Sequence, residues 1–385
     1  MKIAIDIRSL QDKRHSGVQE YLLNLLEELL KIDQDNTYLL FSSGHRIFGH
    51  QDLLKIINQY PDIKIKHLKI ANKFLTIFWR FFNWPNLDKF LEYPDIFFAP
   101  NLNILPKNIL RKTVITFHDL SFRRFPEFFS LKSRLWHIFI RPAILARNAK
   151  SVIAVSDSTA EDTKEFYQIN DEKIRTIPLG TRKDLAEIKD KDDEKLKEIK
   201  DKYNLPDKFI LYLGTLEPRK NVTGIVRSYN LLRKNEAFKD YSLVLTGPKG
   251  WLFKKIFKEA AKSLYKKDII FTGPILRQER ICFYNLASLF VYPSFLEGFG
   301  LPPLEAMSCG LPVIVSNRSS LPSVVGKAGL LIDPYRTGDL AWAIELVLSD
   351  QKFYEILKKE GFLQAEKFNW QKTAQNTLKL FQDLK

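Results

Sequence analysis

The order of apolar runs and helical segments constrains this fold more than any other feature of the sequence. Short apolar runs, such as KIAIDI at residues 2–7, alternate with segments of helical periodicity, such as the one that starts at Gly17. Runs that are apolar on both faces are typical of strands in a parallel sheet that helices cover on both sides. The alternation therefore predicts a doubly wound α/β architecture.

A strongly charged stretch divides the chain into two such series. Residues 182–206 consist largely of Lys, Asp and Glu, a composition typical of an exposed helix or a linker. A second series of strand and helix patterns follows it. We therefore predict a first domain over residues 1–181, a charged linker over 182–206 and a second domain over 207–367. Ligands of doubly wound sheets bind beyond the carboxyl ends of the strands, so the cleft between the domains is the expected site.

Composition and segment lengths are those of a soluble globular protein, with 45% hydrophobic and 27% charged residues. The longest uncharged stretch, residues 281–296, contains a proline and is too short to span a bilayer. The first ten residues are interrupted by Asp6 and Arg8 and do not resemble a secretory signal. The two cysteines, Cys282 and Cys309, indicate neither a disulfide framework nor metal-ligand spacing. We expect a cytoplasmic location.

The segment EGFGLPPLE at residues 297–305 combines residue types that packing alone does not require. Glu297 follows an apolar strand and so lies where ligands of such sheets bind. Gly298 and Gly300 let backbone N–H groups approach a bound group closely, and the two prolines suit the first turn of a helix. That helix start would bind an anion, whereas Glu297 and Glu305 would accept hydrogen bonds from hydroxyls. The segment predicts a phosphate flanked by sugars, as in a nucleotide sugar; the alternative is an ordinary turn and a charge at a helix terminus.

A second segment, GTLEPRKN at residues 214–221, has the same layout. A strand ends at Gly214, and Arg219 and Lys220 stand at the start of a helix. Two cations at the positive end of a helix dipole are electrostatically misplaced unless an anion binds there. Arg219 and Lys220 would stabilise a leaving diphosphate, which is the electrostatic task of a transferase without a metal. The alternative is a solvated helix start.

His118 and Gly17 are further candidates in the first domain. His118 directly follows the apolar run VITF, so it could hydrogen-bond a sugar hydroxyl or transfer a proton. A packed or exposed histidine without such a role is an equally open alternative. Gly17 starts a helix after a loop and would let the backbone approach a phosphate, although a single glycine otherwise marks a turn.

The motifs together resemble those of a known family. GTLEPRKN, EGFGLPPLEAMSCGLPVI, SSLP and GLLIDP occur in the order usual for retaining glycosyltransferases of the GT-B fold. That large family includes bacterial mannosyltransferases and the sucrose and glycogen synthases, and the resemblance covers nearly the whole chain. HDLSFRRFPEFF and GPKGW are most similar to its bacterial mannosyltransferases. The fold that this resemblance implies is two Rossmann-like α/β domains that face each other across a cleft.

The resemblance also implies roles for individual residues. Glu305 would hold the donor ribose, and Glu297 and His118 would contact the transferred sugar. Arg219 and Lys220 would stabilise the diphosphate. The backbone N–H groups of Phe299, Gly300 and Leu301 would lie near the diphosphate. Gly17 would let the first domain close on it, and Gly214 also belongs to the implied donor site.

The implied reaction is transfer of a hexose with retention of configuration, in particular of mannose from GDP-mannose to a polysaccharide or a lipid-linked glycan. The leaving phosphate would help to deprotonate the acceptor, so neither a protein nucleophile nor a metal or other cofactor is expected. A UDP-sugar donor, or a catalytically silent glycan-binding or scaffold protein of the same fold, is the alternative. The family further suggests that the helix at 368–385 packs back on the first domain, which its amphipathic spacing allows.

The net charge of +15 is concentrated at residues 101–150, which contain ten Lys or Arg and two Asp or Glu. Within this region, residues 122–150 mix cations with Phe, Trp and Ile. Basic amphipathic stretches bind anionic membranes, which would suit an acceptor on a lipid diphosphate at the inner face of the cell membrane. The aromatic residues at 72–84 are expected on the same face. No nucleic-acid partner is expected, because no such module is recognisable; a core helix with snorkelling Arg and Lys side chains is the alternative to membrane binding.

Overall fold

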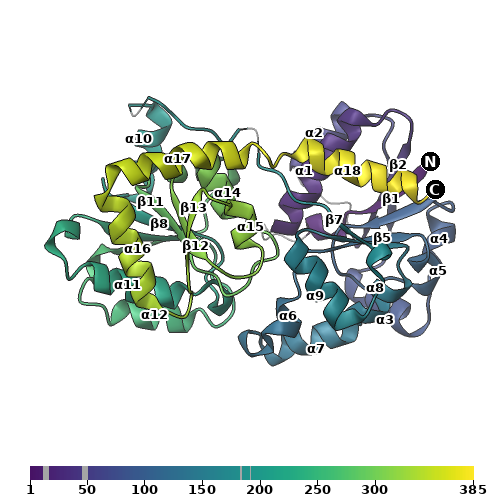
Figure 1. Cartoon of the computed structure of the whole chain (residues 1–385). Coiled ribbons are helices and arrows are strands. Elements are labelled where there is room, and N and C mark those ends of the chain that lie inside the picture. The colour runs from purple at the N-terminus through teal and green to yellow at the C-terminus, as the bar shows by residue number, and fades with distance from the viewer. Residues whose placement is uncertain (12–16, 46–50, 183, 191) are drawn as a thin grey trace. The chain divides into compact units, whose positions relative to one another are not determined.

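The computed structural model describes the whole chain except residues 12–16, 46–50, 183 and 191 (Figure 1). The described residues form two compact units. The first unit contains residues 1–126, 131–180 and 370–385, and the second contains residues 127–130 and 181–369. Each unit is built on a parallel sheet with helices packed around it, so the predicted class of two doubly wound α/β domains is confirmed.

The first unit contains a seven-stranded sheet with the order β3-β2-β1-β4-β5-β6-β7. In chain order its strands are β1 (Lys2–Asp6), β2 (Thr37–Ser43), β3 (Lys64–Leu68), β4 (Ile96–Ala99), β5 (Thr113–Phe117), β6 (Ser151–Ala154) and β7 (Ile174–Thr176). The central strands are buried on both faces, as their continuous apolar runs predict. The strand order reverses between β1 and β4.

Helices and the end of the chain complete the first unit. Its helices are α1 (Gly17–Ile32), α2 (Gln51–Gln59), α3 (Asn72–Phe81), α4 (Leu87–Phe90), α5 (Lys107–Leu110), α6 (Ser121–Arg124), α7 (Leu131–Ile140), α8 (Pro142–Asn148), α9 (Asp157–Tyr167) and α18 (Trp370–Asp383). Figure 1 shows α18, in yellow, beside α1, in purple. The ring of Trp370 lies 6.1 Å from that of Tyr21 on α1, and Phe381 lies 5.5 Å from Phe98 on β4. The carboxy-terminal helix is thus part of the core of the first unit.

The second unit contains a six-stranded sheet with the order β10-β9-β8-β11-β12-β13. Its strands are β8 (Phe209–Leu213), β9 (Ser242–Thr246), β10 (Ile269–Gly273), β11 (Leu289–Tyr292), β12 (Val313–Ser316) and β13 (Gly329–Ile332). Its helices are α10 (Glu194–Tyr203), α11 (Val222–Leu232), α12 (Lys254–Ala261), α13 (Arg280–Leu286), α14 (Leu301–Ser308), α15 (Leu321–Val325), α16 (Thr337–Ser349) and α17 (Gln351–Ala365). Here the strand order reverses between β8 and β11.

The charged stretch at residues 182–206, predicted as a linker, lies within the second unit. Its helix α10 packs against α13 and buries Leu196 and Ile199. The side chains of Lys202 and Tyr203 both donate to the carboxylate of Glu279, at 2.5 and 2.8 Å. Two buried apolar residues therefore attach a helix whose other side chains are mostly charged.

Candidate active site

Two loops meet at the point where the strand order of the second unit reverses. β8 and β11 are hydrogen-bonded neighbours, and the loops at residues 214–221 and 293–300 follow their carboxyl ends. A ligand of a doubly wound sheet binds at this position. The backbone N–H of Phe295 donates to the carbonyl of Arg219 at 2.9 Å, which connects the loops. The two segments that the sequence singled out are therefore adjacent.

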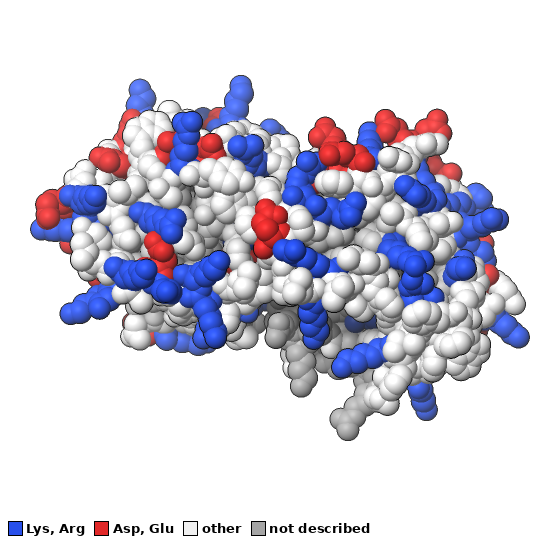
Figure 2. All heavy atoms as spheres, turned by 90° about the horizontal axis from the view of Figure 1, so that it is seen from below, with Lys and Arg blue, Asp and Glu red and all other residues white. Residues whose placement is uncertain are grey.

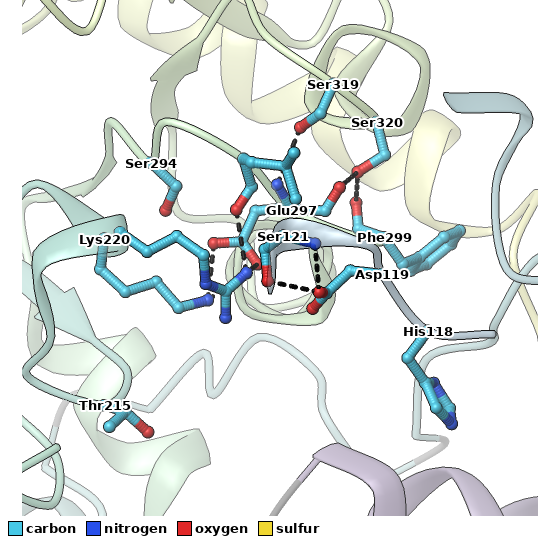
Figure 3. A network of polar contacts seen from close by, with 12 residues as sticks. His118, Asp119, Ser121, Thr215, Lys220, Ser294, Glu297, Phe299, Ser319 and Ser320 are labelled. Atoms are coloured by element: carbon cyan, nitrogen blue, oxygen red, sulfur yellow. Dashed lines mark hydrogen bonds and ion pairs between the residues drawn. The ribbon is translucent and has the colours of Figure 1, made fainter. Parts of the chain in front are cut away.

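Lys220 and Glu297 form a buried ion pair between these loops (Figure 3). Nζ of Lys220 lies 2.6 Å from Oε1 and 2.7 Å from Oε2 of Glu297. It also donates to the hydroxyl of Tyr292 at 2.7 Å. Since an ammonium group has three donors, oxygens of the chain itself engage all of them. A diphosphate that binds Lys220 must take over one of these bonds.

Arg219 is balanced by carboxylates as well. Its guanidinium lies 3.0 Å from Oε1 of Glu217 and 3.5 Å from Oε2 of Glu297. Arg219 and Lys220 stand on a 3₁₀ turn, and α11 begins only at Val222. The expectation that these two cations are misplaced without an anion is therefore wrong, because Glu217 and Glu297 neutralise them.

We define the charge cluster as Glu217, Arg219, Lys220 and Glu297. Its environment shifts the pKa values of Glu217, Lys220 and Glu297. Burial alone would raise the pKa of the Glu297 carboxyl, but the charges of Lys220 and Arg219 outweigh it and hold that pKa below its usual range. Burial raises the pKa of Glu217, and its cationic neighbours offset this only in part. Burial, followed by repulsion from Arg219, lowers the pKa of Lys220. The cluster thus pairs an ionised Glu297 with a lysine that loses its proton more readily than an exposed one.

Two serines that the sequence analysis did not select hold the backbone around Glu297 (Figure 3). The N–H of Glu297 donates to the hydroxyl of Ser319 at 2.8 Å. The hydroxyl of Ser320 lies 3.1 Å from the carbonyl oxygen of Glu297 and 2.7 Å from that of Phe299. Both serines follow β12, the next strand of the sheet. The polar sequence SNRSS after this apolar strand is the signal that would have identified them.

The start of α14 presents unpaired backbone donors. Gly300 has a φ of +112°, a conformation that favours glycine, and α14 begins at Leu301. Within the part of the chain that the structure describes, the N–H groups of Phe299, Gly300 and Leu301 donate to no acceptor. Unpaired N–H groups at a helix start form a site for an anion. This site lies beside the charge cluster, because Glu297 belongs to the same loop.

Glu305 lies in a second, separate network. It is buried in α14 and accepts hydrogen bonds from two residues of α13, at 2.8 Å from the hydroxyl of Tyr284 and at 3.3 Å from the guanidinium of Arg280. Burial and the adjacent carboxylate raise the pKa of Tyr284 well above its ordinary value, so the phenol keeps its proton and donates. A carboxylate offers about four acceptor positions, so ligand hydroxyls can still bind Glu305.

His118 belongs to the first unit and follows β5. Its Nε2 lies 2.8 Å from the carbonyl oxygen of Pro100, and its ring meets that of Tyr21 edge-on at 4.9 Å. Because a carbonyl can only accept, Nε2 carries the proton and Nδ1 of the neutral ring is an acceptor. Burial lowers the pKa of His118, which favours this neutral form. A neutral imidazole can accept a hydrogen bond from a sugar hydroxyl.

The glycines predicted for the donor site differ in their surroundings. A Cβ atom at Gly214 would lie 2.9 Å from the hydroxyl of Tyr212, so packing already requires a small residue there. Gly17 starts α1 and has open space where a Cβ would stand. The loop before it lies outside the described residues. Gly17 and His118 lie in the first unit, and the other predicted site residues lie in the second.

The lowered pKa of His118 predicts a specific loss of stability in acid. In the unfolded chain this histidine has its ordinary pKa of about 6.5, so below that value the unfolded chain binds more protons than the folded one. Stability therefore falls as the pH falls from about 7.5 to about 5.5. We expect the thermal midpoint of His118→Asn to fall less than that of the native protein over this range. Equal slopes for the two proteins would contradict the assignment.

The next features of the described residues concern metal binding, membrane spanning and surface hollows. Among those residues, no group of three or more His, Cys, Asp or Glu could hold a metal ion. None of the described helices is long and apolar enough to cross a membrane. A surface hollow of about 500 Å³ in the first unit is lined by residues that include Arg147, Lys150 and Lys173, and it contains none of the predicted site residues.

Comparisons with known families match both halves of the chain. The family described as glycosyl transferases group 1 matches residues 193–385. The family described as Glycosyltransferase Family 4 matches residues 15–185. The first match covers both loops of the candidate site and α14.

The curated relatives include mannosyltransferases from Escherichia coli. The O-antigen chain mannosyltransferase B is 34% identical over 292 residues, which cover 75% of each chain. The serotype-specific mannosyltransferase WbdA is 34% identical over 275 residues, which cover 71% of this chain and 34% of the relative. The chain thus spans about a third of the length of WbdA.

The solved structures include a neighbour over the full length of the chain. Sucrose-phosphate synthase from Thermosynechococcus elongatus superposes with a TM-score of 0.76 at 20% sequence identity. The superposition covers 100% of this chain and 98% of that one. At this level of identity the likeness concerns the fold.

Proposed function

The chain belongs to the glycosyl transferases group 1, and from this premise we propose that it transfers mannose from GDP-mannose, with retention of configuration, to a polysaccharide or lipid-linked glycan. That it is a glycosyltransferase close to the mannosyltransferases of O-antigen synthesis follows from its relatives. The donor, the stereochemistry and the acceptor are our proposal.

One observation carries the donor assignment. The unpaired N–H groups of Phe299, Gly300 and Leu301 stand beside the Lys220–Glu297 ion pair at the carboxyl edge of the sheet. These donors suit the diphosphate, and Lys220 and Arg219 can stabilise the charge that develops as the nucleotide leaves. In the proposed complex, the carboxylates of Glu297 and Glu305 accept hydrogen bonds from hydroxyls of the hexose and the ribose, respectively.

The proposed step needs no protein nucleophile. The bond between the anomeric carbon and the diphosphate oxygen breaks, and a bond from the acceptor oxygen to that carbon forms on the same face of the sugar. The acceptor proton passes to the leaving phosphate oxygen. Arg219 and Lys220 supply positive charge near the leaving group, and we therefore propose that transfer requires no metal.

A donor screen tests this function. The purified chain is mixed with GDP-mannose, GDP-glucose, UDP-glucose or no nucleotide, and both the thermal midpoint and the slow hydrolysis of each donor are measured. At about 100 times its dissociation constant, a ligand that binds only the folded state stabilises it by about 2.7 kcal/mol. We expect a raised midpoint and hydrolysis with GDP-mannose, both unchanged by EDTA.

The other outcomes of the screen separate the alternatives. A shift with UDP-glucose alone would replace GDP-mannose by a UDP-sugar. No shift with any donor would favour a silent glycan-binding or scaffold protein and would overturn the proposal. The charge cluster argues against a silent protein, because a scaffold gains nothing from a buried Lys220–Glu297 ion pair, with Arg219 beside it, at the switch point of its sheet.

We further propose that the protein works in the cytoplasm at the inner face of the cell membrane. A lipid-linked acceptor would be presented at such a surface. The basic residues at 122–150 support this location through their charge.

A further inference from the structure

Helix α3 presents apolar side chains to solvent as well as to the core. Leu75 and Trp79 are buried and attach the helix to the first unit. Phe74, Ile77 and Phe81 stand on an exposed stripe at helical spacing, and between 44% and 65% of each residue is accessible. A helix on a water-exposed surface normally carries polar residues on this face.

Helix α7 has the same unusual pattern. Leu131, Leu135 and Ile138 follow each other at intervals of four and three residues, and they are 65% to 76% exposed. Ile140 is the buried residue of this helix. Two helices that are far apart in the sequence thus expose apolar stripes.

The two stripes belong to one surface. The ring of Phe139 on α7 lies 6.3 Å from that of Phe81 on α3 and 6.2 Å from that of Trp136. The guanidinium of Arg80 lies 5.5 Å from the ring of Phe81 and 5.6 Å from that of Phe139. We call this surface the α3–α7 face, and its apolar residues are Phe74, Ile77, Phe81, Leu131, Leu135 and Ile138.

The α3–α7 face is also cationic. Residues 72–87 and 128–156 contain no Asp or Glu, whereas Lys73, Arg80 and Arg141 lie within them. Figure 2 views the side on which α3 and α7 lie in Figure 1, and it shows white surface bordered by blue Lys and Arg on this unit. The two helices of this face therefore carry positive charge and no carboxylate.

We propose that the α3–α7 face docks on an anionic lipid bilayer. Aromatic and aliphatic side chains would enter the boundary between headgroups and acyl chains, and the cations would contact lipid phosphates. A contiguous apolar surface of this kind indicates an interaction site. Its positive charge without carboxylates favours a phosphate-bearing surface over a protein partner of mixed charge. The proposal rests on the proposed function, because a lipid-linked acceptor is presented at such a bilayer.

The docking face takes up only part of the basic segment at residues 122–150. Phe122, at the start of the basic segment 122–150, is buried and stacks on His137 at a ring distance of 4.1 Å. That part of the segment faces the protein. The exposed surface combines α7, from this segment, with α3, from the aromatic residues at 72–84 that were expected on the same face.

Flotation with lipid vesicles tests the docking face. The full chain is mixed with vesicles of phosphatidylcholine, with or without phosphatidylglycerol, at low and high salt. We expect binding to the phosphatidylglycerol vesicles that weakens in high salt. Phe81→Glu and Leu135→Glu should each lower the partition coefficient about tenfold or more, because each replaces an exposed apolar side chain that would enter the bilayer by a charged one. Arg80→Gln and Arg141→Gln should each lower it about fivefold.

Leu264→Glu is the matched control, because Leu264 is an isolated leucine of the second unit that is 92% exposed. Its partition coefficient should equal that of the native protein. The proposal would be overturned if Leu135→Glu bound vesicles as well as the native protein does. It would also be overturned if the native protein bound no vesicles but formed a dimer that Leu135→Glu disrupts. Donor hydrolysis without vesicles is measured for every variant and should be unchanged. Hydrolysis without vesicle binding refutes the docking face alone, and vesicle binding without hydrolysis refutes the proposed function alone.

Discussion

Replacement of Lys220 by methionine is expected to lower kcat/KM for sugar transfer by about 10²- to 10³-fold, the usual loss when one preorganised donor to developing charge is removed. In the proposed reaction the negative charge on the diphosphate grows as the nucleotide leaves. Lys220 is the buried cation next to the unpaired N–H groups at the start of α14. Because it acts on charge that appears in the transition state, kcat should fall along with kcat/KM. Release of GDP from GDP-mannose in the steady state measures both.

A stability measurement separates this loss from unfolding. In Lys220→Met the carboxylate of Glu297 stays buried, and its nearest remaining cation, Arg219, is 3.5 Å away. Loss of one partner of a buried ion pair costs about 3–5 kcal/mol. The double variant Lys220→Met/Glu297→Gln removes both charges, so it should regain most of the stability and none of the activity. Native kcat/KM in a folded Lys220→Met protein would show that Lys220 has only a structural role.

The apolar runs were sufficient to predict both sheets. β8 and β11 are buried along their whole length, and strands of this kind are apolar on both faces. Since parallel strands are joined by crossover helices, the alternation also predicts that polar residues after each strand gather at one edge. This is why the loops after β8 and β11 could be chosen from the sequence.

Short or mixed signals set the limit of the fold prediction. β7 has three residues, of which only Ile174 is buried, so it lacks a readable pattern. In α10 the apolar signal consists of Leu196 and Ile199 among many charges. Periodicity could not say which stripe of α3 faces the core, because both stripes are apolar. Only the packing of Leu75 and Trp79 decides that the other stripe is exposed.

The sequence also did not predict which residues form ion pairs and hydrogen bonds with the site residues. Glu297 and Lys220 are 77 positions apart, and nothing in either motif indicates that they neutralise each other. Helix dipole arguments treated Lys220 as an unpaired cation, because they consider only neighbours along the chain. The hydrogen bond from Tyr284 to Glu305 could not be predicted from neighbours along the chain either, because it depends on the packing of α13 against α14. The sequence motifs were enough to identify candidate site residues, whereas the charges that balance them are set by the tertiary structure.

Glu305→Gln is expected to lower kcat/KM for GDP-mannose by about 10- to 100-fold, since a hydrogen bond to a charged group contributes about 1.5–3 kcal/mol. The loss should appear mainly in KM, because the ribose does not change during the reaction. Glutamine keeps an acceptor for Tyr284, so the fold should tolerate the change. Steady-state kinetics measure the effect. Tyr284→Phe is the matched control: it removes a hydrogen bond to Glu305 from the protein side but leaves the carboxylate, so its kinetic effect should be smaller.

A modified donor makes this test specific for the ribose. With a donor that carries 2′-deoxyribose, the native enzyme should lose about as much kcat/KM as Glu305→Gln loses with GDP-mannose, because each change removes one side of the same contact. The variant should then distinguish little between the two donors. If Glu305→Gln discriminates as strongly as the native enzyme, Glu305 does not bind the ribose. Its bonds to Tyr284 and Arg280 would then give it a structural role in holding α13 against α14.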